Sequence, residues 1–465
     1  MIFIEIILTF ISMKVINPYT QKVIQSLPLS SHKEAFEKLE NAVRAKPKMK
    51  ALSSFEKSAI LKEIVEGIKH RFDEFVETIV QESGKPFRYA KGEVERAIQT
   101  FEIASEECKR LPHELFDLDS SPAGHKLKGE YIYFPRGVVF GISPFNFPIN
   151  LAVHKIAPAL AAGCPIVLKP SSKTPLTMEL LSEIIQNTRL PKGGFELVHC
   201  SREVGDELIA HPAINVLSFT GSPEVGWEMK EKAGKKHLVL ELGGNAAAIV
   251  AEDADVERAV NELIVGGFAY AGQVCIHTQR IYVHHSLYEM FVEGYLNKVN
   301  HLKIGNPMEK DTDFSVMIDE ANAIRIEKWV KEAMDSGATC LAGGKREGTL
   351  YFPTVLTNVP KGQKVREEEV FGPVVIIEKF SAIAEAIEAV NDSRWGLQAS
   401  LFTDQIRIRN QVFEELNVGS LIHNKSTTFR VDDMPYGGIK DSGFGREGVR
   451  YAMLDFLEPK LLVRE

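Results

Sequence analysis

Two side chains in the middle of the chain have the types that covalent catalysis needs. Cys275 follows a segment rich in glycine and alanine (266–272), whose backbone allows another chain or a ligand to come close. A cysteine becomes a nucleophile when a base or a dipole lowers the pKa of its thiol. Glu241 ends an apolar run and precedes two glycines, and a carboxylate there can act as a general base on a thiol or on water. A buried core thiol and a salt-bridged glutamate are the alternatives.

Two further segments have residues that suit a nucleotide. The apolar run 216–220 leads into Gly221 and Ser222, and a helix-like stretch containing Gly226 follows. The N–H groups at the start of such a helix bind anions such as a pyrophosphate. Lys169 and Ser172 follow another apolar run, where basic and hydroxyl groups can meet a ribose or a phosphate. A simple tight turn and a solvated lysine loop are the alternatives.

Other patterns in the sequence are weaker evidence for a functional site. The segment 443–448 matches GxGxxG, but that fingerprint belongs to a βαβ unit with an acidic residue about 20 positions further on. The chain ends at Glu465, so we do not expect a dinucleotide site there. No group of His, Cys and Asp residues has the spacing of metal ligands, and we expect no metal site.

The composition limits the class of protein in which these residues work. Of 465 residues, 44% are hydrophobic and 25% are charged, which excludes disordered, collagen-like and disulfide-scaffold proteins. A net charge of -8 without a basic block argues against nucleic-acid and anionic-membrane partners. Five cysteines without a CxxC pair indicate reduced thiols, and hence a cytoplasmic location. Residues 1–12 are apolar but too short to span a bilayer, and we expect them to be an extension.

Short apolar runs alternate with helix-like stretches in two successive series. This alternation is typical of α/β proteins, and it predicts two doubly wound domains with a switch near Gly244. Amphipathic stretches at 55–81 and 92–109 predict helices that pack on the first sheet. The segment 126–134 alternates apolar and polar residues, which predicts a protruding hairpin. The predicted strands are 138–142, 166–169, 195–199, 216–220 and 237–242 in the first series, and 280–284, 352–356, 374–380, 399–403 and 420–424 in the second.

A set of short motifs occurs in a characteristic order. They are PFNFP at 144–148, the Lys169 loop, the Gly221 turn, ELGG at 241–244, GQVC at 272–275, EVFGP at 369–373 and PYGG at 435–438. Over about residues 13–465, the chain resembles the NAD(P)-dependent aldehyde dehydrogenase superfamily. The segments 273–276 and 429–438 are most similar to the lactaldehyde dehydrogenase group, although His277 and Asp433 depart from its usual Ser and His.

The resemblance implies a role for each matching residue. Cys275 would attack the aldehyde carbon, and the Asn146 amide and the Cys275 backbone N–H would hold the oxyanion. Hydride would pass to NADP or NAD, and Glu241 would activate the water that hydrolyses the thioester. The implied cofactor-binding residues are Lys169 and Ser172 near the adenosine ribose, Gly221, Ser222 and Gly226 at the pyrophosphate, Glu369 at the nicotinamide ribose and Phe371 near the ring. An acid at position 172 would repel the 2′-phosphate of NADP, whereas Ser172 and Lys173 would not.

The resemblance also places Arg96, His154 and Arg430 near the aldehyde. Cationic groups are costly to bury without an anion or hydroxyls to meet them, and arginine suits carboxylate, phosphate and sulfonate. We therefore expect a short polar or anionic aldehyde, such as lactaldehyde or glyceraldehyde. In the alternative, the arginines pair with Glu93, Glu95 or Asp432 and do not meet the substrate.

The same resemblance implies domain boundaries and partners. Residues 13–118 and 137–243 would bind the dinucleotide, 244–436 would form the catalytic domain, and 119–136 with 437–465 would join subunits of a homodimer or homotetramer. Two other functions remain open. In a CoA-acylating enzyme the thioester would pass to a thiol, but the presence of Glu241 favours water. A non-catalytic protein with this fold is disfavoured by Cys275, Glu241 and Asn146.

Overall fold

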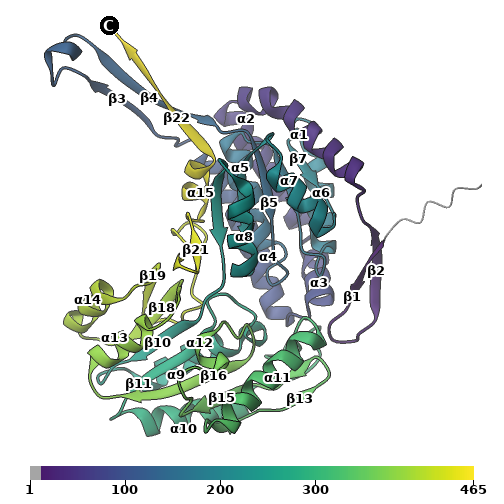
Figure 1. Ribbon diagram of the computed structural model, residues 1–465. Helices are drawn as coiled ribbons and strands as arrows, with labels where there is room; N and C mark the ends of the chain where they lie inside the picture. The colour runs from purple at the N-terminus through teal and green to yellow at the C-terminus, as the bar shows by residue number, and fades with distance from the viewer. Residues whose placement is uncertain (1–11) are drawn as a thin grey trace, which may run out of the picture.

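The computed structural model describes residues 12–465 as two α/β units and a projecting antiparallel sheet (Figure 1). The extension predicted for residues 1–12 lies outside the described residues except for Ser12, which begins strand β1 (Ser12–Ile16). This strand pairs in antiparallel fashion with β2 (Val23–Pro28). The predicted α/β class is confirmed, and each unit has its own sheet.

The first sheet has the order β21-β9-β8-β5-β6-β7 and is parallel except for β21. Every strand predicted in the first series is present, and the ends differ by at most a few residues. Helices between the strands cover the sheet, as a doubly wound fold requires. The elements are β5 (Val138–Ile142), α5 (Asn150–Ala162), β6 (Ile166–Lys169), α6 (Leu176–Gln186), β7 (Phe195–Leu197), α7 (Arg202–Ala210), β8 (Ile214–Thr220), α8 (Pro223–Ala233) and β9 (His237–Glu241).

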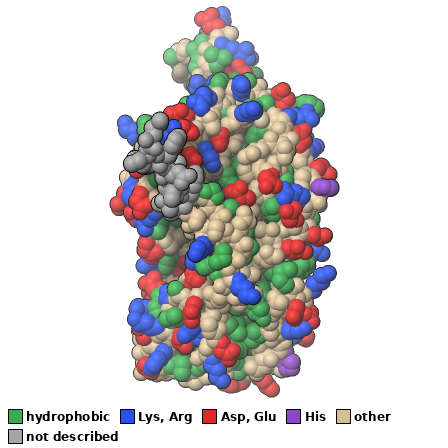
Figure 2. Space-filling model, turned by 90° about the vertical axis from the view of Figure 1, so that its right-hand side faces the viewer, with side chains coloured by type: hydrophobic (Ala, Val, Ile, Leu, Met, Phe, Trp, Pro, Cys, Tyr) green, Lys and Arg blue, Asp and Glu red, His purple; other side chains and the backbone are tan. Residues whose placement is uncertain are grey.

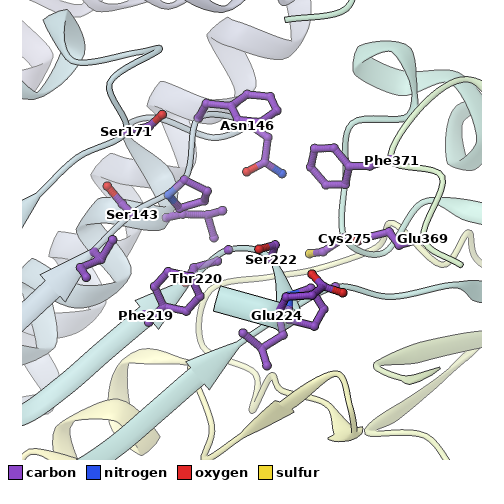
Figure 3. A pocket seen from close by; sticks show the side chains of 18 of the residues that line it. Ser143, Asn146, Ser171, Phe219, Thr220, Ser222, Glu224, Cys275, Glu369 and Phe371 are labelled. Carbon is purple, nitrogen blue, oxygen red and sulfur yellow. The ribbon is translucent and has the colours of Figure 1, made fainter. Parts of the chain in front are cut away.

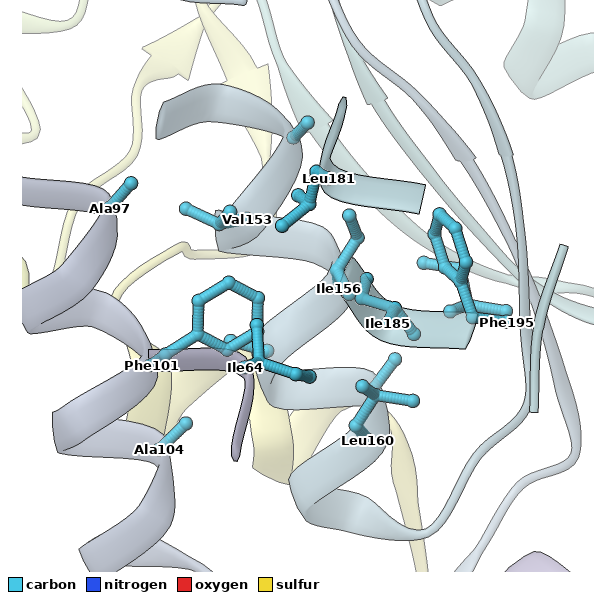
Figure 4. Close-up of a cluster of buried hydrophobic side chains, with 14 of the residues drawn as sticks. Ile64, Ala97, Phe101, Ala104, Val153, Ile156, Leu160, Leu181, Ile185 and Phe195 are labelled. Atoms are coloured by element: carbon cyan, nitrogen blue, oxygen red, sulfur yellow. The ribbon is translucent and has the colours of Figure 1, made fainter. Parts of the chain in front are cut away.

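Four N-terminal helices pack on this sheet, namely α1 (His32–Ala51), α2 (Ser54–His70), α3 (Phe72–Ser83) and α4 (Phe87–Glu107). Capping boxes begin α1 and α2, because Ser31 and Ser53 each exchange hydrogen bonds with a glutamate three residues later. The helical stretch predicted at 55–81 is broken at Arg71, whose backbone leaves the helical conformation. The apolar faces of α2 and α4 meet α5 and α6 in a buried core, which includes Ile64, Phe101, Ile156 and Leu181 (Figure 4).

The second sheet has the order β12-β15-β16-β11-β10-β18-β19, and only β12 is antiparallel. Strand β10 (Ala246–Val250) was not predicted, because its alanines have low strand propensity and only burial in the sheet centre favours it. The other elements are α9 (Val256–Phe268), η2 (Ala269–Gly272), β11 (Thr278–His284), α10 (Tyr288–Asn300), α11 (Glu320–Asp335), β12 (Thr339–Ala342), β13 (Arg346–Glu347), β14 (Leu350–Tyr351), β15 (Thr354–Thr357), α12 (Lys364–Glu367), β16 (Val374–Phe380), α13 (Ile383–Asn391), β17 (Trp395–Gly396), β18 (Gln398–Phe402), α14 (Ile406–Glu415), β19 (Ser420–His423) and β20 (Ile439–Lys440).

The projecting sheet has the order β22-β4-β3, formed by β22 (Leu457–Arg464), β4 (Lys128–Pro135) and β3 (His113–Asp117). It begins before the predicted residue 119, since β3 belongs to it; the short helix η1 (Pro122–Gly124) lies between β3 and β4. In Figure 2 its tip stands above the rest of the molecule, and basic and acidic side chains are interspersed over the visible face.

Only the last part of the segment 437–465, which is predicted to join subunits, lies in this projecting sheet. Strand β21 (Gly443–Phe444) pairs with β9, and helix α15 (Val449–Asp455) packs against α5. Gly443 permits the pairing, because a Cβ there would lie 2.5 Å from the Leu240 carbonyl oxygen. The GxGxxG match thus begins in an antiparallel edge strand of the first sheet.

Candidate active site

Cys275 lies where two cavities meet. The first, the strand-end cavity, has a volume of about 590 Å³ and is lined by the loops that follow β5, β6, β8 and β9. The second, the helical cavity, has a volume of about 280 Å³ and is lined mainly by α4, the start of α5 and the segment around Cys275. Only Leu151 and Cys275 line both cavities, so the sulfur atom can be reached from two sides.

The backbone before Cys275 follows an unusual path. Tyr270 and Ala271 have φ angles of 48° and 51°, and Gly272 has 66°. Non-glycine residues adopt such angles rarely, at a cost that the surrounding contacts must offset. The Tyr270 hydroxyl donates a hydrogen bond to the Ser83 carbonyl oxygen at 2.9 Å. At Gly272 an added Cβ would lie 2.2 Å from the carbonyl oxygen of Gly372, so glycine is required there.

The Cys275 thiol is half-buried and lies beside a phenol. Its Sγ lies 3.1 Å from the hydroxyl oxygen of Tyr436. Burial raises the pKa of the thiol to about 12, against the opposing effect of the Tyr436 hydrogen bond. The thiol is therefore protonated at neutral pH in this state, and activation requires a base or a nearby charge.

Asn146 faces the same cavity as Cys275 from the loop after β5 (Figure 3). Its Nδ2 donates a hydrogen bond to the Gln273 carbonyl oxygen at 3.0 Å, which ties this loop to the cysteine segment. The Gln273 side chain is itself fixed, because its Oε1 accepts a hydrogen bond from the Ile318 backbone at 2.9 Å. The amide is thus held near the place where an oxyanion would form on a carbon bound to Cys275.

A buried ion pair that was not predicted from the sequence joins the same two loops. Lys85 pairs with Glu93, and both side chains are fully buried. Glu93 also accepts hydrogen bonds from the backbone of Ile149 and Asn150 at 3.0 and 3.2 Å. The Lys85 ammonium lies over two aromatic rings, at 3.9 Å from the centre of Phe147 and 4.6 Å from that of Tyr270. One ring belongs to the Asn146 loop and the other to the cysteine segment.

Glu241 is set back from both cavities. It ends β9, is 3% exposed and lines neither cavity. Among the described residues, neither of its carboxylate oxygens has a hydrogen-bond partner. Burial and the nearby Glu447 carboxylate raise the pKa of Glu241 well above its usual range, against the opposing charges of Arg430 and Lys155. Burial thus disfavours the ionised carboxylate, which is the form that acts as a base.

The strand-end cavity fits a dinucleotide. No side chain caps the start of α8, so its first N–H groups remain available to a phosphate. The Glu369 carboxyl accepts a hydrogen bond from the Gly244 backbone at 3.0 Å, and burial raises its pKa to about 8. Of the predicted cofactor-binding residues, those that line the cavity are Lys169, Ser172, Gly221, Ser222, Glu369 and Phe371.

Two residues lie outside this cavity. Gly226 does not line it; an added Cβ would lie 2.3 Å from Leu242, so this glycine serves helix-to-strand packing. Lys173 also lies outside the lining and pairs with Asp319 at 3.1 Å. The attraction of Lys173 for a cofactor phosphate therefore competes with this ion pair.

The helical cavity brings together two of the three predicted substrate residues. Arg96 and Arg430 line it, whereas His154 does not; His154 is buried and lies 2.8 Å from Asp432. The alternative weighed from the sequence is partly correct, because Arg96 makes two hydrogen bonds to Asp432, at 2.5 and 3.2 Å. Arg430 pairs with Glu447 at 3.1 Å.

Two buried donors of this cavity have no acceptor. Among the described residues, neither the Nε of Arg430 nor the Nδ2 of Asn150 has a hydrogen-bond partner. Both residues line the helical cavity, although these two atoms are themselves shielded from solvent. Lys85 and Arg88 add positive charge to the lining, and Glu93 is its only acidic residue. The four cationic side chains of the lining are each paired with a carboxylate.

Within residues 12–465, no three or more His, Cys, Asp or Glu side chains are grouped to hold a metal ion. None of the helices in that range is both long enough and apolar enough to cross a membrane.

A half-buried cysteine with an amide donor beside it, between a dinucleotide-sized cavity and a second cavity, is the arrangement of a thiol-dependent dehydrogenase. The comparisons with known proteins agree. The family model described as "Aldehyde dehydrogenase family" matches residues 10–462. The chain therefore belongs to the aldehyde dehydrogenase family, and it is an enzyme of that class.

Several relatives are similar over nearly the whole chain. A 3-sulfolactaldehyde dehydrogenase of Priestia megaterium is 42% identical and covers 97% of this chain and 94% of its own. A lactaldehyde dehydrogenase of Methanocaldococcus jannaschii is 40% identical and covers 97% of both. Among solved structures, aldehyde dehydrogenase 21 of Physcomitrella patens, in complex with the reaction product succinate, has a TM-score of 0.96 and 46% identity over 98% of this chain and 95% of that one. The glyceraldehyde-3-phosphate dehydrogenase GapN of M. jannaschii, complexed with NADP, has a TM-score of 0.93 and 40% identity over 97% and 98%.

Proposed function

We propose that the protein oxidises a small polar or anionic aldehyde to the carboxylic acid, with NADP or NAD as the hydride acceptor. The observation that carries this proposal is the position of Cys275, which lines both cavities. The aldehyde enters by the helical cavity, and the dinucleotide occupies the strand-end cavity. Residues 13–118 and 137–243 form the dinucleotide-binding domain, and the catalytic domain, 244–436, supplies the nucleophile and also Glu369 and Phe371 at the cofactor cavity.

The residues of the chain divide the reaction between them. The Cys275 sulfur attacks the aldehyde carbon, and the Asn146 amide and the Cys275 N–H hold the oxygen of the thiohemiacetal. The bound cofactor supplies the acceptor for the hydride, which leaves a thioester on the cysteine. Glu241 then takes a proton from water, and the hydroxide attacks the thioester and releases the acid.

The lining of the helical cavity favours an anionic substrate over a neutral one. Arg430 and Asn150 each have a buried donor without an acceptor, and a small side-chain shift that exposes such a donor to the cavity would let an oxygen of a carboxylate, phosphate or sulfonate accept from it. The relatives agree in chemistry, since one acts on 3-sulfolactaldehyde and another structure holds succinate. His154 lies outside the cavity and affects it indirectly. It forms a hydrogen bond with Asp432, and Asp432 accepts a hydrogen bond from Arg96.

The cofactor loop accepts the extra phosphate of NADP. Ser171 and Ser172 line the cavity beside Lys169, and no carboxylate of this loop would repel a 2′-phosphate. The relatives in complex with NADP support this preference. An NAD complex of a 31% identical structure shows that the family also uses NAD.

The decisive experiment measures reduced nicotinamide by absorbance with a panel of aldehydes. The panel pairs anionic aldehydes with neutral ones of the same length, and each is tested with NADP and NAD. We expect turnover, and we expect it to be fastest with an anionic or hydroxylated aldehyde. Activity on hexanal or benzaldehyde tenfold above that on every polar aldehyde would contradict the substrate class, and no turnover at all would favour a non-catalytic protein. Acid formation only in the presence of a thiol such as CoA would favour the acylating alternative.

We also propose a homodimer or homotetramer in the cytoplasm. Leu461, Leu462 and Val463 are exposed on β22, at an open edge of the projecting sheet, which is the surface a second copy would cover. All five cysteines are unpaired, which suits a reducing compartment. Light scattering of the full chain, and of a variant with Leu461 and Val463 changed to Lys, tests the assembly. A wild-type monomer would contradict it.

A further inference from the structure

Among residues 12–465, the Tyr436 hydroxyl is the one group that hydrogen-bonds the sulfur of Cys275, at 3.1 Å. We infer that Tyr436 is a further catalytic residue, whose hydroxyl donates a hydrogen bond to the Cys275 thiolate and stabilises it for attack on the aldehyde. The inference rests on the proposed role of Cys275 as the nucleophile. It assigns the reaction a side chain beyond the oxyanion donors and the general base.

The phenol is fixed in place from several directions. Tyr436 is 2% exposed, and its ring packs in a small apolar cluster with Val274, Ile276 and Leu397. Its backbone exchanges two hydrogen bonds with Glu447, at 3.0 and 2.6 Å. The position of the hydroxyl is therefore set by packing and by the backbone. A donor held in this way loses little entropy when the thiolate forms.

The Arg430 guanidinium strengthens this donor. It stacks on the Tyr436 ring with its carbon 3.7 Å from the ring centre, and Glu447 holds it there at 3.1 Å. A cation over an aromatic face draws electron density from the ring and makes the phenolic hydrogen a better donor. Arg430 also lines the substrate cavity, so it connects the substrate with the nucleophile through one ring.

The direction of the hydrogen bond follows from the chemistry of the attack. A thiolate carries no proton, so the sulfur can only accept and the hydroxyl must donate. The thiol first gives its proton to water, which forms the thiolate. When the S–C bond then forms, the carbonyl π pair moves to the substrate oxygen and the sulfur loses its charge. The tyrosine keeps its proton throughout, because it stabilises the sulfur anion without transferring a proton to it.

The test compares Tyr436→Phe with the wild type in the alkylation of Cys275 by iodoacetamide, measured against pH by brief exposures and peptide mass spectrometry. Loss of a hydrogen bond to a charged atom should move the alkylation curve to higher pH by about one unit. The more basic thiolate is also the stronger nucleophile, so the net fall at neutral pH should be about threefold. Because the Cys275 pKa is about 12, the curves are compared at neutral to mildly alkaline pH, where the rate follows the thiolate fraction. There 3-fluorotyrosine at position 436, a stronger donor, should make the thiol react faster than the wild type, and these opposite movements of the two variants are the signature of the hydrogen bond.

A purely structural role for Tyr436 predicts a different result. A displaced sulfur would react more slowly in Tyr436→Phe but would not react faster with 3-fluorotyrosine at position 436, and that outcome would overturn the inference. Tyr89→Phe is the matched control: Tyr89 lines the same cavity, but its hydroxyl accepts a hydrogen bond from Arg88 at 2.8 Å. We expect its alkylation curve to coincide with that of the wild type.

A second variant keeps the inference testable if Tyr436→Phe does not fold. Incorporation of 3-fluorotyrosine at position 436 preserves the ring and makes the phenol a stronger donor, so the curve should move to lower pH. An unchanged curve would refute the inference. Cys275→Ser separates the two levels of the argument: if that variant kept its dehydrogenase activity, the proposed function would fail, whereas an unmoved curve for Tyr436 variants would overturn only the role of Tyr436.

Discussion

The two cavities that meet at Cys275 are built in different ways. The strand-end cavity has glycines and short hydroxyl side chains at the ends of four parallel strands, such as Gly221 and Ser222 after β8, and larger side chains of the second unit, such as Phe371, complete its lining. The helical cavity consists of long charged and aromatic side chains from segments far apart in the sequence, such as Arg96 in α4 and Arg430 beyond β19. The first binds by available N–H groups, which many phosphates satisfy. The helical cavity would bind a substrate with charged side chains that are already paired with other side chains of the protein.

This difference predicts where substitutions act. In the strand-end cavity, a change alters affinity for the cofactor and leaves the fold intact. In the helical cavity, removal of one charge also removes the partner of another buried charge, so effects on substrate and on stability are mixed. Residues where the two cavities meet, such as Cys275, should affect the chemical step and not only the affinity for the cofactor or for the substrate.

The largest effect should come from Cys275, which belongs to both cavities. We expect Cys275→Ala to lower turnover by a factor on the order of a thousand or more, because no other side chain replaces the nucleophile. Cofactor affinity, measured by the fluorescence of the reduced nicotinamide, and the melting temperature should stay near those of the wild type. Residual turnover above a few per cent would contradict the assignment of Cys275 as the nucleophile. It would also contradict the idea that the reaction takes place where the two cavities meet.

Glu241 should have the next largest effect, and only on hydrolysis. In Glu241→Gln we expect acyl-enzyme to accumulate, seen as a mass increase on Cys275, with turnover lower by about a hundredfold or more. Burial and Glu447 raise the pKa of Glu241, and only the ionised carboxylate acts as a base. In the wild type, therefore, hydrolysis should speed up as the pH rises through this raised pKa, and the variant should lose that rise. Unchanged turnover without a covalent adduct would refute the role.

The arginines test whether the helical cavity selects by charge. For the double variant Arg96→Leu and Arg430→Leu, we expect kcat/KM for an anionic aldehyde to fall by about ten- to a hundredfold. The fall for a neutral aldehyde of the same length should be smaller, and this ratio is the internal control for misfolding. An unchanged KM for the best anionic substrate would show that the arginines only hold Asp432 and Glu447.

The smallest effect should come from the cofactor loop. Ser172→Glu places a carboxylate beside Lys169, and we expect kcat/KM for NADP to fall about tenfold while that for NAD changes little. Ser172→Ala is the matched control and should leave the ratio of the two cofactors unchanged. If the glutamate lowered both cofactors equally, position 172 would not meet the 2′-phosphate.

The same contrast explains what the sequence could predict. Strand ends are visible as apolar runs followed by glycine and hydroxyl residues, so Lys169, Ser172, Gly221 and Ser222 were found and do line a cavity. Gly226 has the same signal but serves packing, because a glycine required by a ligand and one required by a neighbouring leucine look alike in a sequence.

The helical cavity was harder to predict, since its contacts join residues far apart in the chain. Arg96 pairs with Asp432, 336 positions away, and His154 turned out to hold that same aspartate from outside the cavity. Lys85 and Glu93 were missed as a pair, because a lysine buried between two rings has no local signal. Tyr436 occurs in a quoted motif, yet only the fold brings its hydroxyl to the sulfur.

The contact between Gly272 and Gly372 couples the loop that carries Cys275 to the loop that carries Phe371. The turn before the nucleophile rests directly on the turn after Phe371, which itself has a φ of 45°. Neither backbone can shift without pushing the other, so the positions of the sulfur and of the cofactor-side loop are adjusted together. A substitution that widens one cavity would therefore also change the shape of the other. A methyl group at position 272 would push the two loops apart.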